Sequence, residues 1–331
     1  MPEVSVVLPV FNGAETIVRA ARSILEQSFR DLELIVVDDG STDDTVSRLR
    51  GIGDARLRLI EQAHRGVVSA ANTATALARA PFIARMDADD VSRPERIDKQ
   101  LRLLREHELD VVGCQVRILD ELSRAVPAMR RYEAWINEET LEPETILALR
   151  FVEFPLVHPT ILARRSYFEM GYRDGEFPED YDLMLRASNE GRRFGKVCEV
   201  LFDWHDSTRR LTRSDPRYSA ESFDHCRRNH LLSGPLRDVG HVDVWGIGRT
   251  GKRWLLWLEK SGIEVRRGYD INTRKVGMKV HGVTVAHPDD LIRADGTPLL
   301  LAVGAEGART IIRPQLESQG YRVGVDAWFV A

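Results

Sequence analysis

The chain has 331 residues, of which 47 are basic and 51 acidic, so its formal net charge is −4. At roughly 100–200 residues per domain, this length predicts two domains, or one large domain with an appendage. The near-neutral balance argues against a dedicated nucleic-acid-binding protein, which usually carries a basic surplus. The cysteines Cys114, Cys198 and Cys226 are far apart and form neither a metal-binding motif nor a disulfide framework, which is typical of a reducing cytosol.

The N-terminal sequence MPEVSVVLPV lacks the basic segment and the long apolar run of a signal peptide. No stretch of the chain approaches the roughly 18 apolar residues that would span a bilayer. We therefore expect a cytoplasmic protein whose contact with the inner face of a membrane is at most peripheral.

The first 115 residues alternate between short apolar runs and amphipathic segments. The runs are rich in β-branched residues and predict buried strands at 4–10, 34–37, 58–61, 82–86 and 110–116. Helices are expected at 14–27, 67–79 and 94–107. A further helix is expected to begin at a capping box formed by Ser41 and Asp44. This alternation with short loops predicts a mainly parallel, doubly wound sheet.

The rest of the chain divides into an irregular part, a connector and a second α/β unit. The irregular part predicts a hairpin at 116–130, helices at 139–150 and 180–190, and strands at 160–163 and 196–204. The second unit predicts strands at 242–245, 264–269, 283–285, 299–303 and 323–329, with helices after 251 and at 305–318. The expected domains are therefore 1–205, a helical connector at 206–240, and 241–331.

Carboxylates follow two of the expected strands. Asp38 and Asp39 come after the strand at 34–37, and Asp87, Asp89 and Asp90 come after the strand at 82–86. Ligands of open parallel sheets bind beyond the carboxyl ends of the strands. Clustered carboxylates repel one another unless a cation or ligand donors compensate them, and oxygen ligands suit Mg²⁺ or Mn²⁺. The alternative is that each aspartate only caps the helix that follows it.

An ordered series of motifs resembles family 2 glycosyltransferases, which have the GT-A fold with its doubly wound mixed sheet. Residues 3–115 resemble the nucleotide-sugar-binding half of these enzymes, and the resemblance continues to about residue 205. The matching segments are VSVVLPVFN at 4–12, ILEQSF at 24–29, ELIVVDDGSTD at 33–43, Gly66 with AAN at 70–72, and MDADD at 86–90.

The resemblance implies a donor site at the carboxyl edge of the sheet. The donor-binding residues that it implies are Pro9, Val10, Phe11, Asn12, Asp38, Asp39 and Asp87. Asp39 accepts a hydrogen bond from the base, and Asp38 supports it. Asp87 lies near the ribose, and Asp89 binds Mn²⁺ or Mg²⁺ on the diphosphate. Departure of a nucleoside diphosphate builds negative charge, which such a metal stabilises in the transition state.

The segment FPEDYDL at 177–183 matches the acceptor-side motif of the family. Asp180 then corresponds to the general base that takes the proton of the acceptor hydroxyl, in one in-line displacement with inversion. Glu179 is expected on the acceptor or diphosphate side. The alternative is that these carboxylates only favour a helix N-terminus.

Two histidines are further candidates by resemblance. His158 is expected to contact phosphate or acceptor, with a structural role as the alternative. His205 is expected as a metal or diphosphate ligand together with Asp87 and Asp89. The sequence FDWH at 202–205 departs from the family's more common pattern.

A glycine-rich loop, GIGRTG at 246–251, follows an expected strand and opens a helix, and Asp270 ends the next strand. This is the context of a nucleotide-binding fingerprint, in which Gly246, Gly248 and Gly251 let phosphate approach the helix and Asp270 binds ribose. The region also resembles Rossmann-like modules appended to sugar-modifying enzymes. The alternative is a scaffold that packs against the transferase or forms a homodimer.

Together these features predict a metal-dependent inverting glycosyltransferase. Its donor is expected to be a nucleotide sugar, best a UDP-sugar, and its acceptor a saccharide or lipid-linked saccharide hydroxyl in surface-polysaccharide or glycoconjugate synthesis. A nucleic-acid partner is not expected. The alternatives are a nucleotidyltransferase on a similar sheet, against which the acceptor-side motif argues, and a non-enzymatic nucleotide-binding scaffold.

Overall fold

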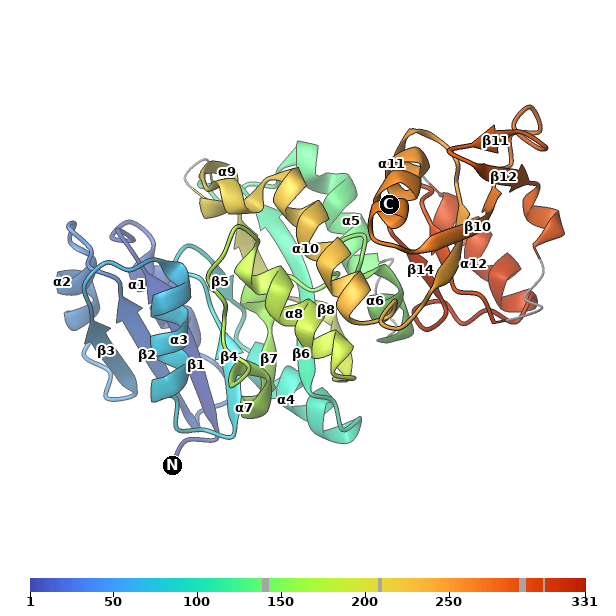
Figure 1. Cartoon of the computed structure of the whole chain (residues 1–331). Helices are drawn as coiled ribbons and strands as arrows, with labels where there is room; N and C mark the ends of the chain where they lie inside the picture. The colour runs from blue at the N-terminus through green and yellow to red at the C-terminus, as the bar shows by residue number, and fades with distance from the viewer. Residues whose placement is uncertain (139–142, 208–209, 292–295, 306) are drawn as a thin grey trace. The chain divides into compact units, whose positions relative to one another are not determined.

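The computed structural model describes residues 1–138, 143–207, 210–291, 296–305 and 307–331, and the chain forms two compact units. The first unit comprises residues 1–143 and 155–226, and the second comprises 144–154 and 227–331. Each unit has its own sheet (Figure 1). Residues 206–207 and 210–226, expected in a separate connector, belong to the first unit.

The first unit is built on an eight-stranded sheet with the order β3-β2-β1-β4-β7-β6-β8-β5. Neighbours among β3, β2, β1 and β4 are parallel, β7 is antiparallel to both of its neighbours, β6 and β8 are parallel, and β5 is antiparallel to β8. The predicted mixed, doubly wound sheet is thus confirmed. The strands are β1 (Val4–Val10), β2 (Leu32–Asp38), β3 (Leu57–Glu61), β4 (Phe82–Arg85), β5 (Val91–Ser92), β6 (Val111–Leu119), β7 (Leu162–Arg164) and β8 (Phe194–His205).

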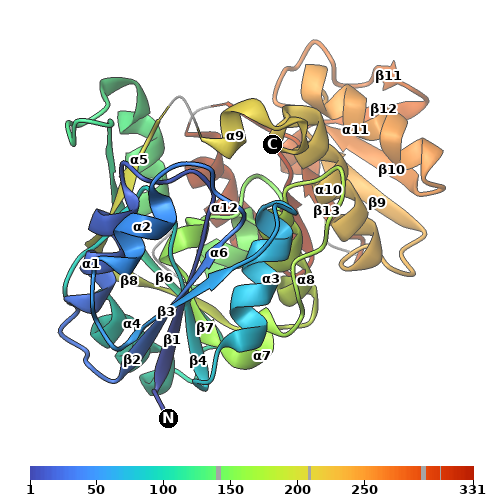
Figure 2. The ribbon, with the colours of Figure 1, turned by 90° about the vertical axis from the view of Figure 1, so that its left-hand side faces the viewer.

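Helices cover both faces of this sheet, as Figure 2 shows with α1, α2 and α4 on one side of the strands and α3, α7 and α8 on the other. Because both faces are covered, every residue of β1 and β2 is buried. The helices of this unit are α1 (Ile17–Leu25), α2 (Thr45–Arg50), α3 (Val67–Leu77), α4 (Arg96–Glu106), α5 (Arg130–Glu138), α7 (Arg165–Phe168), α8 (Glu179–Asn189) and α9 (Leu211–Ser214).

The prediction of a hairpin at 116–130 is wrong, because no second strand follows β6 there. The chain makes an isolated bridge between Leu119 and Ala125 and then continues into α5. The Asn137 side chain of α5 donates to the Val116 carbonyl at 2.7 Å and accepts from the Val116 amide at 2.9 Å. A side chain therefore satisfies the backbone groups that a hairpin partner would have paired.

The capping box expected from Ser41 and Asp44 is also absent. Helix α2 begins at Thr45, and Asp44 makes no side-chain capping bond. The Ser41 hydroxyl instead accepts a hydrogen bond from the Asn12 amide at 2.8 Å, so it joins the loops after β1 and β2.

The second unit has a six-stranded sheet with the order β11-β12-β10-β9-β13-β14. All neighbouring pairs are parallel except β11 with β12, so the expected second α/β alternation is present. The strands are β9 (His241–Trp245), β10 (Glu264–Tyr269), β11 (Lys279–Val280), β12 (Val283–Ala286), β13 (Leu299–Leu301) and β14 (Ala327–Phe329). The helices include α6 (Pro143–Leu149), α11 (Arg249–Lys260) and α12 (Ala308–Ser318).

Helix α10 (Ala220–Ser233) contributes residues to both units, with the division after Cys226. The helix expected at 139–150 corresponds to α6, and residues 139–142 lie outside the described residues. Across the described ranges, no helix is both long and apolar enough to cross a membrane.

Candidate active site

The carboxyl ends of three parallel strands bring the predicted donor-site loops to one edge of the sheet. Val10 at the end of β1 is in register with Asp38 at the end of β2, and Val7 is in register with Arg85 at the end of β4. Asn12 joins the first two loops, because its side-chain oxygen accepts from the Thr42 amide at 2.8 Å. The loop at 9–12 and the carboxylates therefore lie at one edge.

Asp39 is buried, and its carboxylate is surrounded by donors from the segment before α3. One oxygen accepts from the Gln62 side chain at 2.6 Å and the Arg65 amide at 3.0 Å. The other accepts from the Gly66 amide at 2.7 Å and lies 2.8 Å from Nδ1 of His64. These four contacts use the acceptor capacity of a carboxylate.

The neighbouring Asp38 is also buried but is less completely paired. Its Oδ2 accepts from the Ser41 amide at 3.0 Å. Its Oδ1 is buried and has no hydrogen-bond partner among the described residues. A buried carboxylate oxygen without a donor is costly, so this atom is a candidate acceptor for a ligand.

Two exposed rings stack beside Asp39. The rings of Phe11 and His64 have centroids 4.1 Å apart and an interplanar angle of 28°. Phe11 is 46% exposed, which is unusual for a large apolar side chain in this unit. The exposed Phe11 ring can serve as a platform for a flat heterocycle, and His64 is held against Asp39.

The acidic cluster consists of Asp87, Asp89 and Asp90, with one ligand oxygen from each lying within 4.8 Å of the others. Burial and the charge of Asp87 raise the pKa of Asp89. Burial and the charge of Asp89 raise the pKa of Asp90 further above its usual range. These shifts show that the cluster is short of positive charge.

His205 at the end of β8 lies next to this cluster. Its backbone amide donates to Oδ1 of Asp90 at 2.7 Å. Oδ2 of Asp90 and Nδ1 of His205 are both buried and have no hydrogen-bond partner among the described residues. The three aspartate carboxylates are oxygen ligands of the kind that suit Mn²⁺ or Mg²⁺, so they fit such a metal. The ring nitrogens of His205 do not belong to the set of ligand atoms that lie within 4.8 Å of one another. Asp90 was expected in the acidic cluster but was not predicted as a metal ligand.

Three arginines partly balance the cluster. Arg85, which is buried, lies 2.7 Å from Oδ1 of Asp87. Arg19 on α1 donates to the Asp89 carbonyl at 3.0 Å. Arg210 lies over the Trp204 ring at 4.5 Å and interacts electrostatically with Asp89 and Asp90. Arg19 and Arg85 were not among the predicted site residues, although an arginine inside a buried strand two residues before Asp87 was a usable signal.

Helix α8 begins at Glu179 and carries Asp180 in its first turn. Burial, followed by the charge of Glu179, raises the pKa of Asp180 to about 7. The Tyr181 amide donates to the Asp180 carboxylate at 2.7 Å, as expected at a helix N-terminus. The charge of Asp87 contributes to the same rise in pKa, so the acidic cluster acts electrostatically on the start of α8.

His158 pairs with Tyr172, whose hydroxyl lies 3.0 Å from Nε2. Burial and the charge of Arg85 lower the pKa of His158 to about 3, so its imidazole is neutral at physiological pH. The Asn72 side chain donates to the Tyr172 carbonyl and accepts from the Tyr172 amide, each at 2.9 Å. These contacts give His158 a structural partner at the edge of the site.

The glycine-rich loop of the second unit follows β9 and leads into α11. Gly246 has a φ of +102°, and a Cβ there would lie 2.7 Å from the Ala302 carbonyl oxygen. A Cβ on Gly251 would collide with the Gly246 carbonyl, whereas a Cβ on Gly248 would meet open space. The first and last glycines are therefore required by the fold, and Gly248 is not.

Asp270 at the end of β10 is engaged within the second unit. Its Oδ2 accepts from the Ile247 amide at 3.1 Å and from Nζ of Lys275 at 2.6 Å, and its Oδ1 accepts from the Asn272 amide at 2.9 Å. These contacts hold the glycine-rich loop. A ribose at this position would have to displace Lys275.

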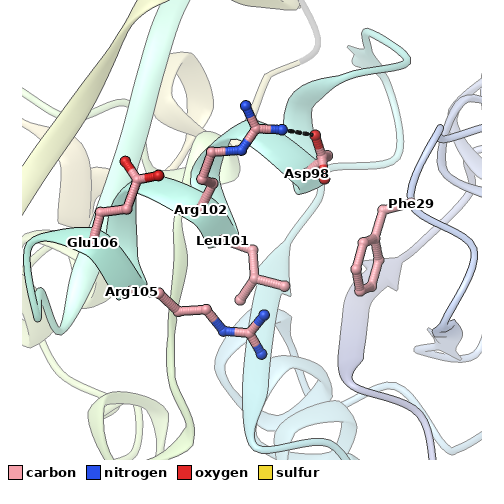
Figure 3. Close-up of a pocket in the computed structure, with 6 residues that line it drawn as sticks. All are labelled: Phe29, Asp98, Leu101, Arg102, Arg105 and Glu106. Atoms are coloured by element: carbon pink, nitrogen blue, oxygen red, sulfur yellow. Dashed lines mark hydrogen bonds and ion pairs between the residues drawn. The ribbon is translucent and has the colours of Figure 1, made fainter.

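A surface hollow of about 330 Å³ lies elsewhere, on the outer side of α4 (Figure 3). Arg102 pairs with Asp98 at 2.8 Å on its rim. None of the predicted site residues lines it. The lining residues are Phe29, Asp98, Leu101, Arg102, Arg105 and Glu106.

Comparison with known proteins decides the family. The model of the family described as Glycosyl transferase family 2 matches residues 5–171. The chain belongs to this family. It is thus a glycosyltransferase. The matched residues include the acidic edge of the first unit and end before α8.

Similar proteins in the family include bacterial relatives, two of which are named for succinoglycan biosynthesis. The putative glycosyltransferase EpsE of Bacillus subtilis is 30% identical, over 73% of this chain and 87% of its own length. Two succinoglycan biosynthesis proteins of Rhizobium meliloti are also similar. ExoO is 36% identical over 78% of each chain, and ExoU is 31% identical over 92% of this chain and 93% of its own. The ExoU match extends into the second unit.

Solved structures of glycosyltransferases share the GT-A fold. Staphylococcus aureus TarS 1-349 in complex with UDP-GlcNAc has a TM-score of 0.58 at 20% identity, covering 72% of this chain and 68% of that chain. The mannosyltransferase PcManGT from Pyrobaculum calidifontis, in complex with GDP-Man and Mn²⁺, has a TM-score of 0.51 at 21% identity, covering 70% and 62%.

Proposed function

We propose that this glycosyltransferase is metal-dependent and inverting, and that it moves a sugar from a UDP-sugar to a saccharide or lipid-linked saccharide hydroxyl. The proposal rests on two groups of side chains, one suited to bind a metal and one suited to remove a proton. An acidic cluster with unpartnered ligand atoms follows β4, and the half-buried carboxylate of Asp180, whose pKa is raised, lies at the start of α8. The acidic cluster is suited to stabilise the leaving group through a metal, and Asp180 is suited to remove the acceptor proton.

The metal is proposed to be held by Asp89 together with Asp87, Asp90 and His205. When bound, it supplies positive charge that stabilises the leaving diphosphate. Arg85 holds the Asp87 carboxylate, so Asp87 is oriented before any ligand arrives. Arg19 and Arg210 supply further positive charge beside Asp89.

Asp180 is proposed to act as the general base. Its carboxylate takes the proton from the acceptor hydroxyl as the oxygen attacks the anomeric carbon from the face opposite the leaving group. A pKa of about 7 is close to the operating pH, which is where a general base is most effective. One displacement of this kind inverts the anomeric configuration.

The nucleotide base is proposed to lie on Phe11 and to reach Asp39. Because all four acceptor positions of Asp39 are used, a base N–H can bind only where a protein donor leaves. Nδ1 of His64, which also lies 3.0 Å from the Asp39 carbonyl oxygen, is the contact from an exposed side chain, with 56% of that side chain accessible. A single ring donor on the base could replace it, which suits uracil.

The relatives support a role in polysaccharide synthesis, because ExoO and ExoU are succinoglycan biosynthesis proteins. The TarS complex holds UDP-GlcNAc, and the PcManGT complex holds GDP-Man and Mn²⁺. We therefore propose a cytoplasmic enzyme that acts on a growing saccharide, with peripheral contact at the inner face of the membrane where the acceptor is lipid-linked.

A test of this function is donor turnover by the full chain with Mn²⁺, Mg²⁺ or EDTA and a panel of nucleotide sugars. We expect metal-dependent release of a nucleoside diphosphate, and a product whose anomeric configuration is inverted by NMR. Release of pyrophosphate when the chain is given a nucleoside triphosphate and a sugar 1-phosphate would identify a nucleotidyltransferase instead. Turnover that is unchanged in EDTA would refute the metal dependence.

The second unit is proposed to be a Rossmann-like module that binds a nucleotide at its glycine-rich loop. Its parallel sheet order and the open space beside Gly248 support this role. A thermal-shift screen of the full chain with nucleotides, comparing wild type with Gly248→Val, tests it. A shift that the variant loses supports binding there. No shift, or one that the variant keeps, favours a scaffold or homodimer role.

A further inference from the structure

The segment that follows β8 reaches the candidate base. Its short 3-10 helix, η3 (Pro216–Tyr218), packs in the first unit with the start of α8. The Tyr218 hydroxyl donates to the Glu179 carboxylate, lying 2.7 Å from Oε1 and 2.8 Å from Oε2. Arg217 lies 3.9 Å from the same carboxylate and is itself held by Asp215 at 3.0 Å.

Glu179 needs these partners because its side chain is buried. Only 6% of the residue is exposed, and burial raises its pKa, whereas the bond from Tyr218 and the charges of Arg217 and Arg85 favour the ionised form. A buried carboxylate without donors would be strongly destabilising. The segment after β8 therefore stabilises the charge that lies next to Asp180.

We propose that Tyr218 is a positioning residue for the Asp180 base. The inference rests on the proposed function, because it assumes that Asp180 removes the acceptor proton. The Tyr218 hydroxyl holds the Glu179 carboxylate, and this contact fixes the first turn of α8 and keeps a negative charge beside Asp180. Tyr218 acts through Glu179 and has no contact with the reacting atoms in this account.

Several charged and titratable groups face the Glu179–Asp180 pair. Arg217 and Tyr218 come from η3. The other groups are Arg85 from β4, Asp87 from the acidic cluster, Tyr167 from α7, and Tyr172. Since the charge of Glu179 raises the pKa of Asp180, loss of the Tyr218 hydroxyl should make Glu179 easier to protonate and Asp180 easier to ionise.

The experiment compares pH profiles of kcat/KM for wild type, Tyr218→Phe, Glu179→Gln and the double variant. In Tyr218→Phe we expect the acidic limb to move down by about half a unit to one unit, with a fall in kcat of about threefold to tenfold and an unchanged KM for the donor. Glu179→Gln should move the limb in the same direction. If Tyr218 acts through Glu179, the double variant moves it no further.

Control variants distinguish the role of Tyr218 from a loss of folding and from a failure of the proposed function. Tyr321→Phe makes the same change at a buried tyrosine of the second unit and should leave the profile unchanged. If Tyr218→Phe does not fold, Arg217→Met should give a smaller shift in the same direction. An unmoved limb, an upward shift, or a shift that persists in the Glu179→Gln background overturns the role of Tyr218. Failure of Asp180→Asn to impair transfer would instead overturn the proposed base.

Discussion

The guanidinium of Arg85 lies 2.7 Å from the carboxylate of Asp87, where β4 meets the acidic cluster. The Arg85 side chain is 5% exposed, and that of Asp87 is 27% exposed. An arginine is always charged in a protein, so this buried cation offsets the carboxylates before any metal or donor binds. Charge balance at the site thus begins within the sheet itself.

Replacing Arg85 by Met should strongly destabilise the first unit, because it leaves Asp87 without its partner. Loss of one member of a buried pair costs about 3–5 kcal/mol of unfolding free energy. Urea denaturation measures this change. Arg102→Met, which removes an exposed pair on α4, is the matched control and should change stability little. Equal stability of the two variants would contradict the role of Arg85.

Replacing His205 by Gln should weaken the metal dependence of transfer. The imidazole nitrogen that lacks a partner is then absent, and we expect the Mn²⁺ concentration for half-maximal activity to rise about tenfold or more. The measurement is a Mn²⁺ titration of donor turnover. Asp98→Asn on the outer face of α4 should leave the titration unchanged. An unaltered midpoint in His205→Gln would remove His205 from the ligand set.

The activity should rise with pH through about 7. Burial raises the pKa of Asp180 to about 7, and a general base works only in its ionised form. Below that pH the carboxyl is neutral and transfer slows, while above it the rate reaches a plateau. A profile of kcat/KM between pH 5 and 9 reports the apparent pKa of the coupled Glu179–Asp180 pair. A plateau already complete at pH 5 would show that no such base controls the reaction.

Replacing His64 by Ala should tighten UDP binding, whereas replacing Phe11 by Ala should weaken it. The first change frees an acceptor position on Asp39, and the second removes the stacking surface. Stacking of a base on an aromatic ring contributes about 1–3 kcal/mol. Calorimetric titration with UDP and Mn²⁺ measures both effects. Weaker binding in His64→Ala would show that His64 contacts the nucleotide rather than competing with it.

The regular part of the first unit could be predicted from the sequence because its signals are local. The apolar run at 4–10 is a strand buried on both faces, and the apolar positions from Ile17 to Leu25 form one face of α1. The acidic edge followed from the same pattern, since parallel strands bring their carboxyl ends together. These predictions needed no knowledge of distant contacts.

Other features depend on pairings that no local pattern contains. Asn137 replaces a hairpin partner by binding Val116, 21 residues away. Tyr218 binds Glu179 across 39 residues, from a segment that was expected to be a helical connector. The four donors around Asp39 become visible only when the segment before α3 is folded against β2. Each of these is a side chain satisfying a buried polar group, which hydrophobic periodicity does not encode.

The central claim is that metal-assisted donor binding and proton removal belong to different residues of one site. The most direct measurement pairs calorimetric titration of the donor with a transfer assay, in the presence of Mn²⁺, for Asp180→Asn and Asp89→Ala. We predict that Asp180→Asn keeps the donor affinity of wild type and loses transfer by at least about a hundredfold, whereas Asp89→Ala loses both. Full transfer by Asp180→Asn, or loss of donor binding in that variant, would contradict the account.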